Sequence, residues 1–339
     1  MSERSKMILG RVAQAVPVVV GVVVISFLLT RALPGDPAAY FAGPAADEAS
    51  IAQIREALGL DKSLFEQFFY YVGDLARGDL GTSLTTGQTV MSDLAARLPA
   101  SLELTLVALL LSCAIAIPLG VLAATRPGTW VDHLCRVLVT AGVSMPTFFT
   151  GIVLIYVFYY LAGLAPSPLG RLDFVYLSPP HVTGFYLIDA ALAGDWETWL
   201  GALKQLILPA TTLALFTLAP IARMTRAAML SALSSDFIRT ARAAGLGNGK
   251  VLYGYAFRNA LLPVVTTLGM VFSFTLGANV LVEKVFAWPG IGSYAVEALV
   301  VSDYAAVQGF VLAMALLFVV LNLIIDITYA LIDPRIGLK

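Results

Sequence analysis

The segment Gly245-Leu-Gly-Asn-Gly-Lys250 is the stretch of the chain closest in residue types to a phosphate-binding loop. In the motif G-x-x-x-x-G-K-[ST], backbone N–H groups and a lysine bind phosphates, and a Ser or Thr hydroxyl binds magnesium. Here the spacing is one residue too short, Val251 replaces the Ser or Thr, and no strand precedes the segment. We therefore expect no cofactor bound by this chain. If ATP drives its function, we expect ATP and magnesium to be bound by separate ATPase subunits.

Residues suited to catalysis or metal binding are scarce. The chain has two histidines, His133 and His181, and two cysteines, Cys113 and Cys135, without C-x-x-C spacing. The sequence also lacks a nucleophile elbow, an H-E-x-x-H motif and a run of paired carboxylates. These features argue against a metal site, a disulfide framework and a membrane-embedded enzyme. We predict no catalytic residue and no metal ligand.

A basic segment between two apolar runs is the most distinctive polar feature of the chain. It extends from Arg223 to Arg258 and carries six cations against a single acid, Asp236. Its centre, residues 235–244, is rich in small residues and suits a short helix that Gly245 would end. Such a segment indicates either a docking site for a partner or only a topological signal, because Lys and Arg accumulate in cytoplasmic loops. The six cations are Arg223, Arg226, Arg239, Arg242, Lys250 and Arg258.

Polar residues inside the apolar runs are the candidates for a transport pathway. Four of them make one run unusually polar, and we predict that they line such a pathway: Ser273, Thr275, Asn279 and Glu283. The alternative is that they hold helices together through hydrogen bonds. Glu103 and Asp326 are also ionisable groups in apolar runs. Because both lie toward the ends of their runs, structural pairing or solvation by headgroups is favoured over a proton relay.

The elements that must position these residues are membrane-spanning helices. Of the 339 residues, 59% are hydrophobic and only 13% are charged, against about 25% charged in soluble domains. Because lipid leaves backbone groups without water partners, only helices or closed barrels span a bilayer, and alternating ten-residue strands are not seen. We predict an all-α integral membrane protein with six transmembrane helices of about 20 residues each. The six runs are Met7–Leu33, Ser101–Ala124, Val137–Leu161, Leu206–Ala222, Ala260–Val282 and Val307–Ile332.

The distribution of Lys and Arg predicts the orientation. With the N-terminus in the cytoplasm, thirteen of the 21 cations lie in inside segments and eight in outside segments. The excess of cations inside favours an N-in and C-in topology. The reverse orientation would place the six-cation segment outside.

The first outside segment, residues 32–98, is long and has helix signals of its own. Leu33-Pro-Gly-Asp-Pro37 predicts a helix break. Asp47–Leu58, followed by Gly59, and Ser63–Arg77, with a capping box and followed by Gly78, predict two short amphipathic helices. These helices would lie on the membrane surface or a partner, or only shield the helix ends. We therefore divide the chain into residues 1–98, the first helix with this extracytoplasmic segment, and 99–339, the core domain with five helices.

Three prolines follow a common pattern. Leu98-Pro99 and Leu208-Pro209 precede small and hydroxyl residues, Leu262-Pro263 precedes Val264-Val265-Thr266-Thr267, and each leads into an apolar run. Since the first turn of a helix tolerates proline, the pattern predicts three helix starts. The second outside segment, residues 165–203, is rich in proline and aromatic residues, which favours anchoring at the membrane interface over a stacking site for a ligand.

Several motifs together resemble a known family. Residues 236–246, DFIRTARAAGL, followed by Arg258-Asn-Ala-Leu-Leu-Pro-Val264, are similar to the cytoplasmic loop of binding-protein-dependent ABC importer permeases, in the form of the dipeptide/oligopeptide permease family. The resemblance covers essentially the whole chain. Supporting stretches are Arg31–Pro37, Gly78–Ser83, Leu98–Thr105, Ser144–Phe148, Val285–Gly292 and Asp333–Arg335.

The resemblance implies a type I importer permease fold in a bacterial inner membrane. It implies a second permease subunit, often non-identical, two cytoplasmic ABC ATPases that bind ATP and magnesium, and an extracytoplasmic substrate-binding protein, with no nucleic-acid partner. The loop within residues 223–258 would dock on an ATPase and couple ATP hydrolysis to alternating access. The docking residues carried over are Ser235, Asp236, Phe237, Arg239, Thr240, Ala241, Arg242, Ala244 and Gly245.

The start of the loop departs from the general pattern of such permeases. Where that pattern begins with Glu-Ala-Ala, this chain has Arg239-Thr240-Ala241, so no salt bridge from the glutamate is expected. The resemblance implies dipeptides or short oligopeptides as substrate, with nickel complexes, glutathione, opines or oligosaccharides as alternatives. A secondary transporter is a weaker alternative, because neither coupling-ion residues at mid-membrane nor a repeat is visible.

Overall fold

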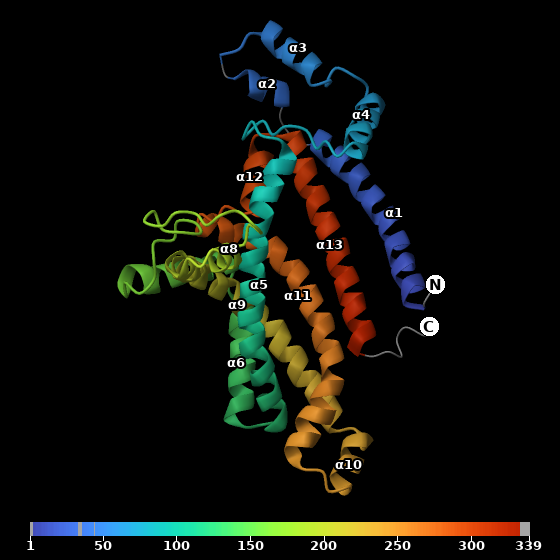
Figure 1. Cartoon of the computed structure of the whole chain (residues 1–339), viewed down its shortest axis with the longest axis vertical. Coiled ribbons are helices and arrows are strands. Elements are labelled where there is room, and N and C mark those ends of the chain that lie inside the picture. The colour runs from blue at the N-terminus through green and yellow to red at the C-terminus, as the bar shows by residue number, and fades with distance from the viewer. Residues whose placement is uncertain (1–2, 33–35, 44, 333–339) are drawn as a thin grey trace. The chain divides into compact units, whose positions relative to one another are not determined.

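The computed structural model describes residues 3–32, 36–43 and 45–332, and its regular elements are helices (Figure 1). The motif Asp333–Arg335 and residues 33–35 of the predicted helix break lie outside this part. Within it there is one isolated bridge, between Thr82 and Thr89, and no named strand. This confirms the all-helical class. The elements are α1 (Glu3–Ala32), α2 (Pro37–Ala42), α3 (Glu48–Ala57), α4 (Leu64–Ala76), α5 (Val90–Thr125), α6 (Trp130–Ser144), α7 (Thr147–Leu154), the π-helix η1 (Ile155–Leu161), α8 (Tyr186–Leu192), α9 (Trp196–Leu233), α10 (Asp236–Ala243), the π-helix η2 (Lys250–Phe257), α11 (Arg258–Val285), α12 (Ile291–Val300) and α13 (Tyr304–Ile332).

The chain divides into two compact units. Unit 1 comprises residues 1–99 and 290–323, and unit 2 comprises residues 100–289 and 324–339. In unit 1, Val90 and Leu94 at the start of α5 pack with Tyr294 of α12 and Ala306 of α13. Gly309 of α13 allows this close packing, because a Cβ there would lie 2.3 Å from a Val90 methyl carbon.

Helix α9 is the centre of unit 2. It packs against α6, α7, α8 and α11. Its most apolar window is 67% buried, against 39% or less for the other long apolar helices. Small residues bring its neighbours close: a Cβ on Gly142 of α6 would lie 2.6 Å from the Leu215 carbonyl oxygen of α9, and one on Gly120 of α5 would lie 2.7 Å from Thr225 Cβ. Close approach at small residues is typical of helices packed in membranes.

Four helices in the described part are long and apolar enough to cross a membrane. They are α5, the continuous η2–α11 segment Lys250–Val285, α9, and α13 over Tyr304–Ile325. These coincide with four of the six predicted runs. The other two runs fall on α1, which is apolar over Val16–Ala32, and on α6, α7 and η1.

The third predicted run, Val137–Leu161, is not one continuous helix. Helix α6 ends at Ser144, and Met145 is extended, with φ −111° and ψ 135°. The cause is Pro146, since the ring of a proline disfavours helical dihedrals in the residue before it. The helical course resumes at Thr147 and passes into η1. The prediction of an uninterrupted helix is therefore wrong at this point.

The prediction that Pro99, Pro209 and Pro263 mark helix starts is also wrong. Helix α5 begins at Val90, α9 begins at Trp196 and α11 begins at Arg258, so each proline lies inside a helix. A proline there removes one backbone hydrogen bond. The extensive packing of these long helices offsets that loss, because tertiary context overrides local propensity.

The two short helices predicted after the first apolar run are confirmed. The Asp47 carboxylate accepts a hydrogen bond from the Ser50 N–H and caps α3. Ser63 and Glu66 form a complete capping box at the start of α4. Both helices are followed by a left-handed glycine, Gly59 at φ +65° and Gly78 at φ +79°.

Candidate functional site

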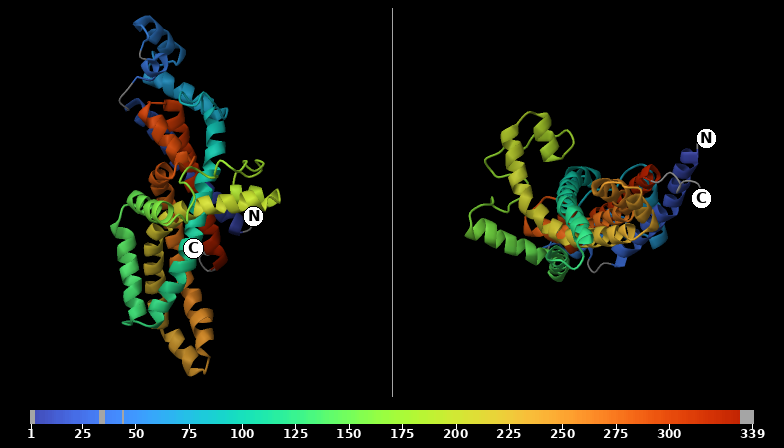
Figure 2. Two further views of the ribbon diagram at one scale, coloured as in Figure 1. Left: turned by 90° about the vertical axis from the view of Figure 1, so that its left-hand side faces the viewer. Right: turned by 90° about the horizontal axis from the view of Figure 1, so that it is seen from below.

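The predicted docking helix is present as α10, Asp236–Ala243. It lies at the end of α9 and η2 within unit 2 (Figures 1 and 2). The helix ends in two capping hydrogen bonds. The Gly245 N–H donates to the Arg242 carbonyl, and the Leu246 N–H donates to the Ala241 carbonyl. Gly245 has φ +75°, the left-handed conformation that this helix ending requires. The predicted helix and its glycine stop are confirmed.

The two faces of α10 are chemically different. Ile238 is 0% exposed and Ala241 is 6% exposed, and both pack in a cluster with Met229 of α9 and Val251 and Ala256 of η2. The other predicted docking residues of the helix and its C-terminal end are exposed: Asp236, Phe237, Arg239, Thr240, Arg242, Ala244 and Gly245. The helix is thus held from one side by its own chain and presents an aromatic ring and two guanidinium groups on the other.

The charges on the exposed face of α10 are available to a partner. Arg239 lies 3.4 Å from Asp236, but the two side chains are 82% and 93% exposed. An ion pair that open to water contributes about 0–1 kcal/mol, so it does not hold Arg239 in place. Ser235, at the N-cap, directs its hydroxyl to the Ala232 carbonyl instead of capping α10.

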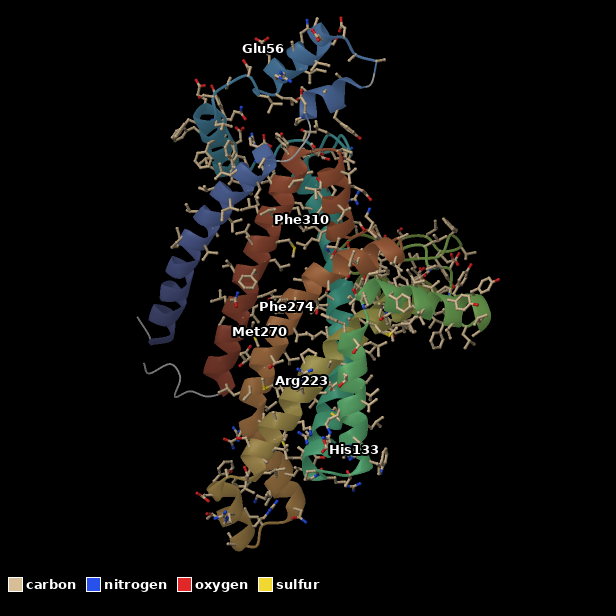
Figure 3. The ribbon with its side chains drawn as sticks, turned by 180° about the vertical axis from the view of Figure 1, so that it is seen from behind. Glu56, His133, Arg223, Met270, Phe274 and Phe310 are labelled. Carbon is tan, nitrogen blue, oxygen red and sulfur yellow. The ribbon has the colours of Figure 1, made fainter. Side chains whose placement is uncertain are left out.

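A buried ion pair ties α6 to the part of α9 that leads into α10. Asp132 of α6 is 2% exposed and accepts hydrogen bonds from Arg226 of α9 at 2.6 and 3.0 Å. These bonds from Arg226, together with the Gly128 N–H, lower the pKa of Asp132 from its ordinary value of 3.8 to about 2. The carboxylate is therefore ionised at any physiological pH. Arg226, one of the six cations of the basic segment, serves this internal contact, whereas Arg223 is exposed (Figure 3).

Three of the four predicted pathway residues lie on one buried face of α11. Thr275, Asn279 and Glu283 follow each other at four-residue spacing and are 0–1% exposed. The Asn279 amide donates to the Ser101 carbonyl and to Thr105 Oγ1 of α5, both at 3.3 Å, and Ser101 Oγ donates to Glu283. Asn279 and Glu283 therefore form a polar seam between α11 and α5, while Thr275, on the same face, donates to the Val271 carbonyl of its own helix.

The remaining pathway candidate and the opposite face of α11 are more accessible. Ser273 is half-buried and donates to the Gly269 carbonyl one turn earlier. Met270 and Phe274 are 52% and 72% exposed (Figure 3). Sequence reasoning missed the α5 half of the seam. The signal was present, because Ser101 and Thr105 are spaced four apart and so share a helix face.

Glu103 is engaged in structural pairing, as the sequence favoured. Its carboxylate accepts a hydrogen bond from Arg171 at 2.5 Å and one from the Leu187 N–H at 2.8 Å. The two charged side chains are 4% and 6% exposed. Arg171 also donates to the Gly184 carbonyl, and its guanidinium lies 3.5 Å from the centre of the Tyr186 ring. The partner of Glu103 was not predicted, because it comes from a distant loop. The side chain of Asp326 is not among those described.

Comparison with known proteins identifies relatives over nearly the whole chain. A family model described as "Binding-protein-dependent transport system inner membrane component" matches residues 116–338, and the model for the N-terminal part of such components matches residues 5–105. A probable D,D-dipeptide transport system permease protein of Escherichia coli is 48% identical, over 94% of each chain. A di/tripeptide transport system permease protein of Pseudomonas aeruginosa is 42% identical, over 96% of this chain and 97% of the relative. A dipeptide transport system permease protein of E. coli is 38% identical, over 98% of both.

Proposed function

The chain belongs to the family of inner-membrane components of binding-protein-dependent transport systems. We propose that it is the permease subunit of an ATP-driven importer of dipeptides or short oligopeptides. The named relatives that cover nearly its full length are peptide permeases. The chain itself hydrolyses no ATP. Its work is to form half of a transmembrane pathway and to transmit force to it.

We place the chain in a bacterial inner membrane with six crossings and both termini in the cytoplasm. Helices α5, α9, α11 and α13 make four crossings. Helix α1 makes another, and α6 with α7 and η1 shares the remaining one across the break at Pro146. Partners in this assembly are a second permease subunit, two ABC ATPases that bind ATP and magnesium, and an extracytoplasmic substrate-binding protein.

The observation that carries the mechanism is the two-faced helix α10. Ile238 and Ala241 fix it to η2 and α9, so a push on α10 moves the helices it rests on. Phe237, Arg239 and Arg242 face outward and suit a cleft with an apolar floor and acidic rim on an ATPase. When ATP closes the two ATPases, α10 carries their motion through η2 into α11.

The seam between α5 and α11 is where that motion would reach the pathway. Asn279 and Glu283 bond to α5 in this structure. We propose that the seam of Asn279 and Glu283 loosens in the transport cycle, and that Thr275 on the same face and Ser273 beside it then border the pathway. Buried hydrogen bonds suit a contact with two states. In each state the same buried polar groups must find hydrogen-bond partners, so intermediate positions are disfavoured.

Charge reversal at Arg239 tests the docking role. The importer, with both permease subunits and both ATPases, is reconstituted in vesicles and its ATP hydrolysis is measured with and without the binding protein and dipeptide. Arg239→Glu is expected to lower stimulated hydrolysis about ten-fold, because like charges across an interface are costly.

The matched control is Arg126→Glu, which reverses an exposed charge of the α5–α6 loop and leaves α10 unchanged. It is expected to retain stimulation. The proposal is wrong if the two variants behave alike while the Arg239→Glu complex remains assembled.

A further inference from the structure

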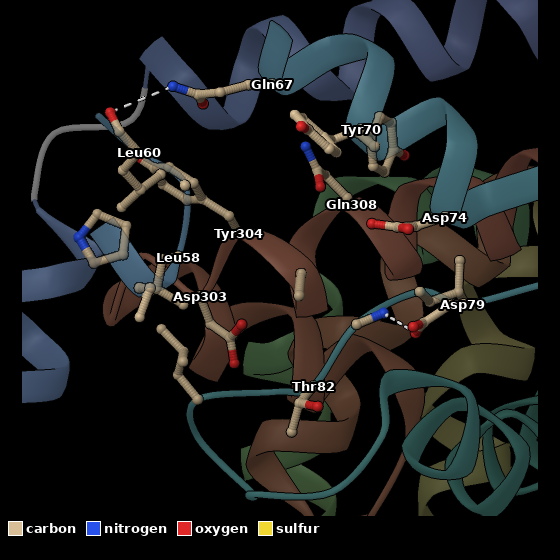
Figure 4. A pocket seen from close by; sticks show the side chains of 18 of the residues that line it. Leu58, Leu60, Gln67, Tyr70, Asp74, Asp79, Thr82, Asp303, Tyr304 and Gln308 are labelled. Atoms are coloured by element: carbon tan, nitrogen blue, oxygen red, sulfur yellow. Dashed lines mark hydrogen bonds between the residues drawn. The ribbon is translucent and has the colours of Figure 1, made fainter. Parts of the chain in front are cut away.

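Unit 1 contains a cavity of about 370 Å³ that the proposed coupling mechanism does not use. It lies among Tyr70 and Asp74 of α4, the turn at Leu58 that follows α3, and Tyr304 and Gln308 of α13 (Figure 4). Cavities of about 300 to 1,000 Å³ are typical of small-molecule sites. The volume therefore suits a ligand at the small end of that range.

Arg31 is the best-defined recognition group of the cavity. Its guanidinium is half-buried and lies 4.1 Å from the centre of the Phe27 ring and 5.2 Å from that of Tyr304. Its Nε and Nη2 donate to Gln67 Oε1 at 3.2 Å, and its Nη1 donates to Thr30 Oγ1 at 3.1 Å. The two rings and two polar side chains hold the guanidinium plane in one orientation.

The hydrogen bonds of Arg31 leave donors unused. A guanidinium has five N–H groups, and the three bonds leave one N–H on each terminal nitrogen. Two parallel N–H groups are what a carboxylate accepts in a bidentate contact. In the described residues no carboxylate forms an ion pair with Arg31.

The other charges around the cavity are of both signs. Lys62 places its ammonium 4.0 Å from the Tyr70 ring centre and, in the described part, forms no ion pair. Three acids also line the cavity. Asp303 is buried and accepts bonds from Ser83, Thr85 and the Ala306 N–H. Asp74 forms an exposed pair with Arg77, and Asp79 accepts from the Gly81 N–H. The lining therefore carries both signs of charge, and Arg31 with Lys62 is the part of it that suits an anion.

We propose that this cavity binds the C-terminal carboxylate of a short peptide, with Arg31 as the carboxylate receptor and the tyrosine rings as the walls for its side chains. The peptide as ligand rests on the proposed function, whereas carboxylate recognition rests on Arg31 itself. The site would hold a peptide on this chain, apart from the binding protein and from the α5–α11 seam.

Binding of radiolabelled dialanine to the permease–ATPase complex without the binding protein tests the proposal. Wild type is expected to bind dialanine about ten-fold more tightly than its C-terminal amide, the difference of one charge-assisted bidentate contact. Arg31→Gln is expected to lower dialanine affinity by the same factor and to remove the preference over the amide. Arg31→Lys keeps the charge without the paired donors, and its affinity for dialanine is expected to lie between those of wild type and Arg31→Gln.

The matched control is Arg97→Gln, since Arg97 is half-buried on the same unit, lies over the Tyr294 ring and does not line the cavity. It is expected to bind as wild type does, and thermal unfolding of every variant checks that the fold is retained. The proposal is overturned if wild type binds dialanine and its amide equally or binds neither. It is also overturned if Arg31→Gln binds dialanine as wild type does and loses only its association with the binding protein. Dipeptide uptake by the complete wild-type importer separates the two levels: uptake without binding at this cavity refutes the site alone, whereas absent uptake refutes the proposed function.

Discussion

At the scale of single residues, Gly245 is the position where backbone conformation and proposed function meet. Its φ of +75° closes α10, and no neighbouring atom lies within 4 Å of a Cβ placed there. Any side chain is therefore disfavoured by conformation and not by space. A non-glycine residue in the left-handed region costs about 1–2 kcal/mol. Gly247, two residues on, has the same open surroundings without a positive φ.

These two glycines provide a matched pair of substitutions. Gly245→Ala is expected to loosen the end of α10, raising amide hydrogen exchange there about 5- to 30-fold, as the conformational cost implies. Stimulated ATP hydrolysis is expected to fall with it. Gly247→Ala is expected to change neither. Hydrogen exchange of the purified complex, read on peptides that cover residues 235–246, measures the difference, and equal exchange in the two variants would contradict the role given to Gly245.

At the scale of elements, the loop between η1 and α9 is held by one buried ion pair. Arg171 reaches from this loop to Glu103 of α5, while α8 begins beside the same carboxylate through the Leu187 N–H. Asp189 organises the rest of the loop by accepting from the Thr183 hydroxyl and from the N–H groups of Thr183 and Gly184. Burial raises the pKa of Asp189, and these hydrogen bonds outweigh burial and lower it. Charged side chains thus position both ends of this loop.

Removing one partner of this pair is expected to lower the stability of the fold more than removing both. Glu103→Gln leaves a buried guanidinium uncompensated, and loss of one partner of a buried pair costs about 3–5 kcal/mol. The double variant Glu103→Leu with Arg171→Met replaces the pair by apolar side chains and is expected to recover most of that loss. Thermal unfolding of the purified chain and proteolysis within residues 163–195 report the two effects. A double variant as unstable as the single one would show that the loop depends on the bonds of Arg171 to Gly184 instead.

Local signals in the sequence predicted the short elements well, and long-range packing decided the rest. The caps at Asp47 and Ser63 and the helix end at Gly245 depend on residues within one helical turn, so the local sequence predicts them. The interior positions of Pro99 and Pro209 were missed because packing along a long helix outweighs one lost hydrogen bond. Arg171 was missed as the partner of Glu103 because the two lie 68 residues apart. Only the α11 half of the polar seam was predicted, because its residues are polar types in an apolar run. The α5 half is indicated in the sequence by residue spacing alone.

At the scale of the whole molecule, the membrane topology is the proposal on which the others depend. It places α4, before the start of α5, on the outer side and α10 on the cytoplasmic side. Phe65 of α4 is 79% exposed and Gly247 is exposed, so a cysteine at either position is accessible to a reagent. The native Cys113 and Cys135, which are at least half-buried, are replaced by Ala to remove background.

In intact cells with a permeabilised outer membrane, a membrane-impermeant maleimide is expected to label Phe65→Cys and not Gly247→Cys. After the inner membrane is opened, both are expected to react. The odd number of crossings between the two positions, made by α5, by α6 with α7 and η1, and by α9, demands this difference. Equal labelling of the two positions in intact cells would mean that the segment broken at Pro146 does not complete a crossing, and α10 would then lie on the wrong side of the membrane to meet an ATPase.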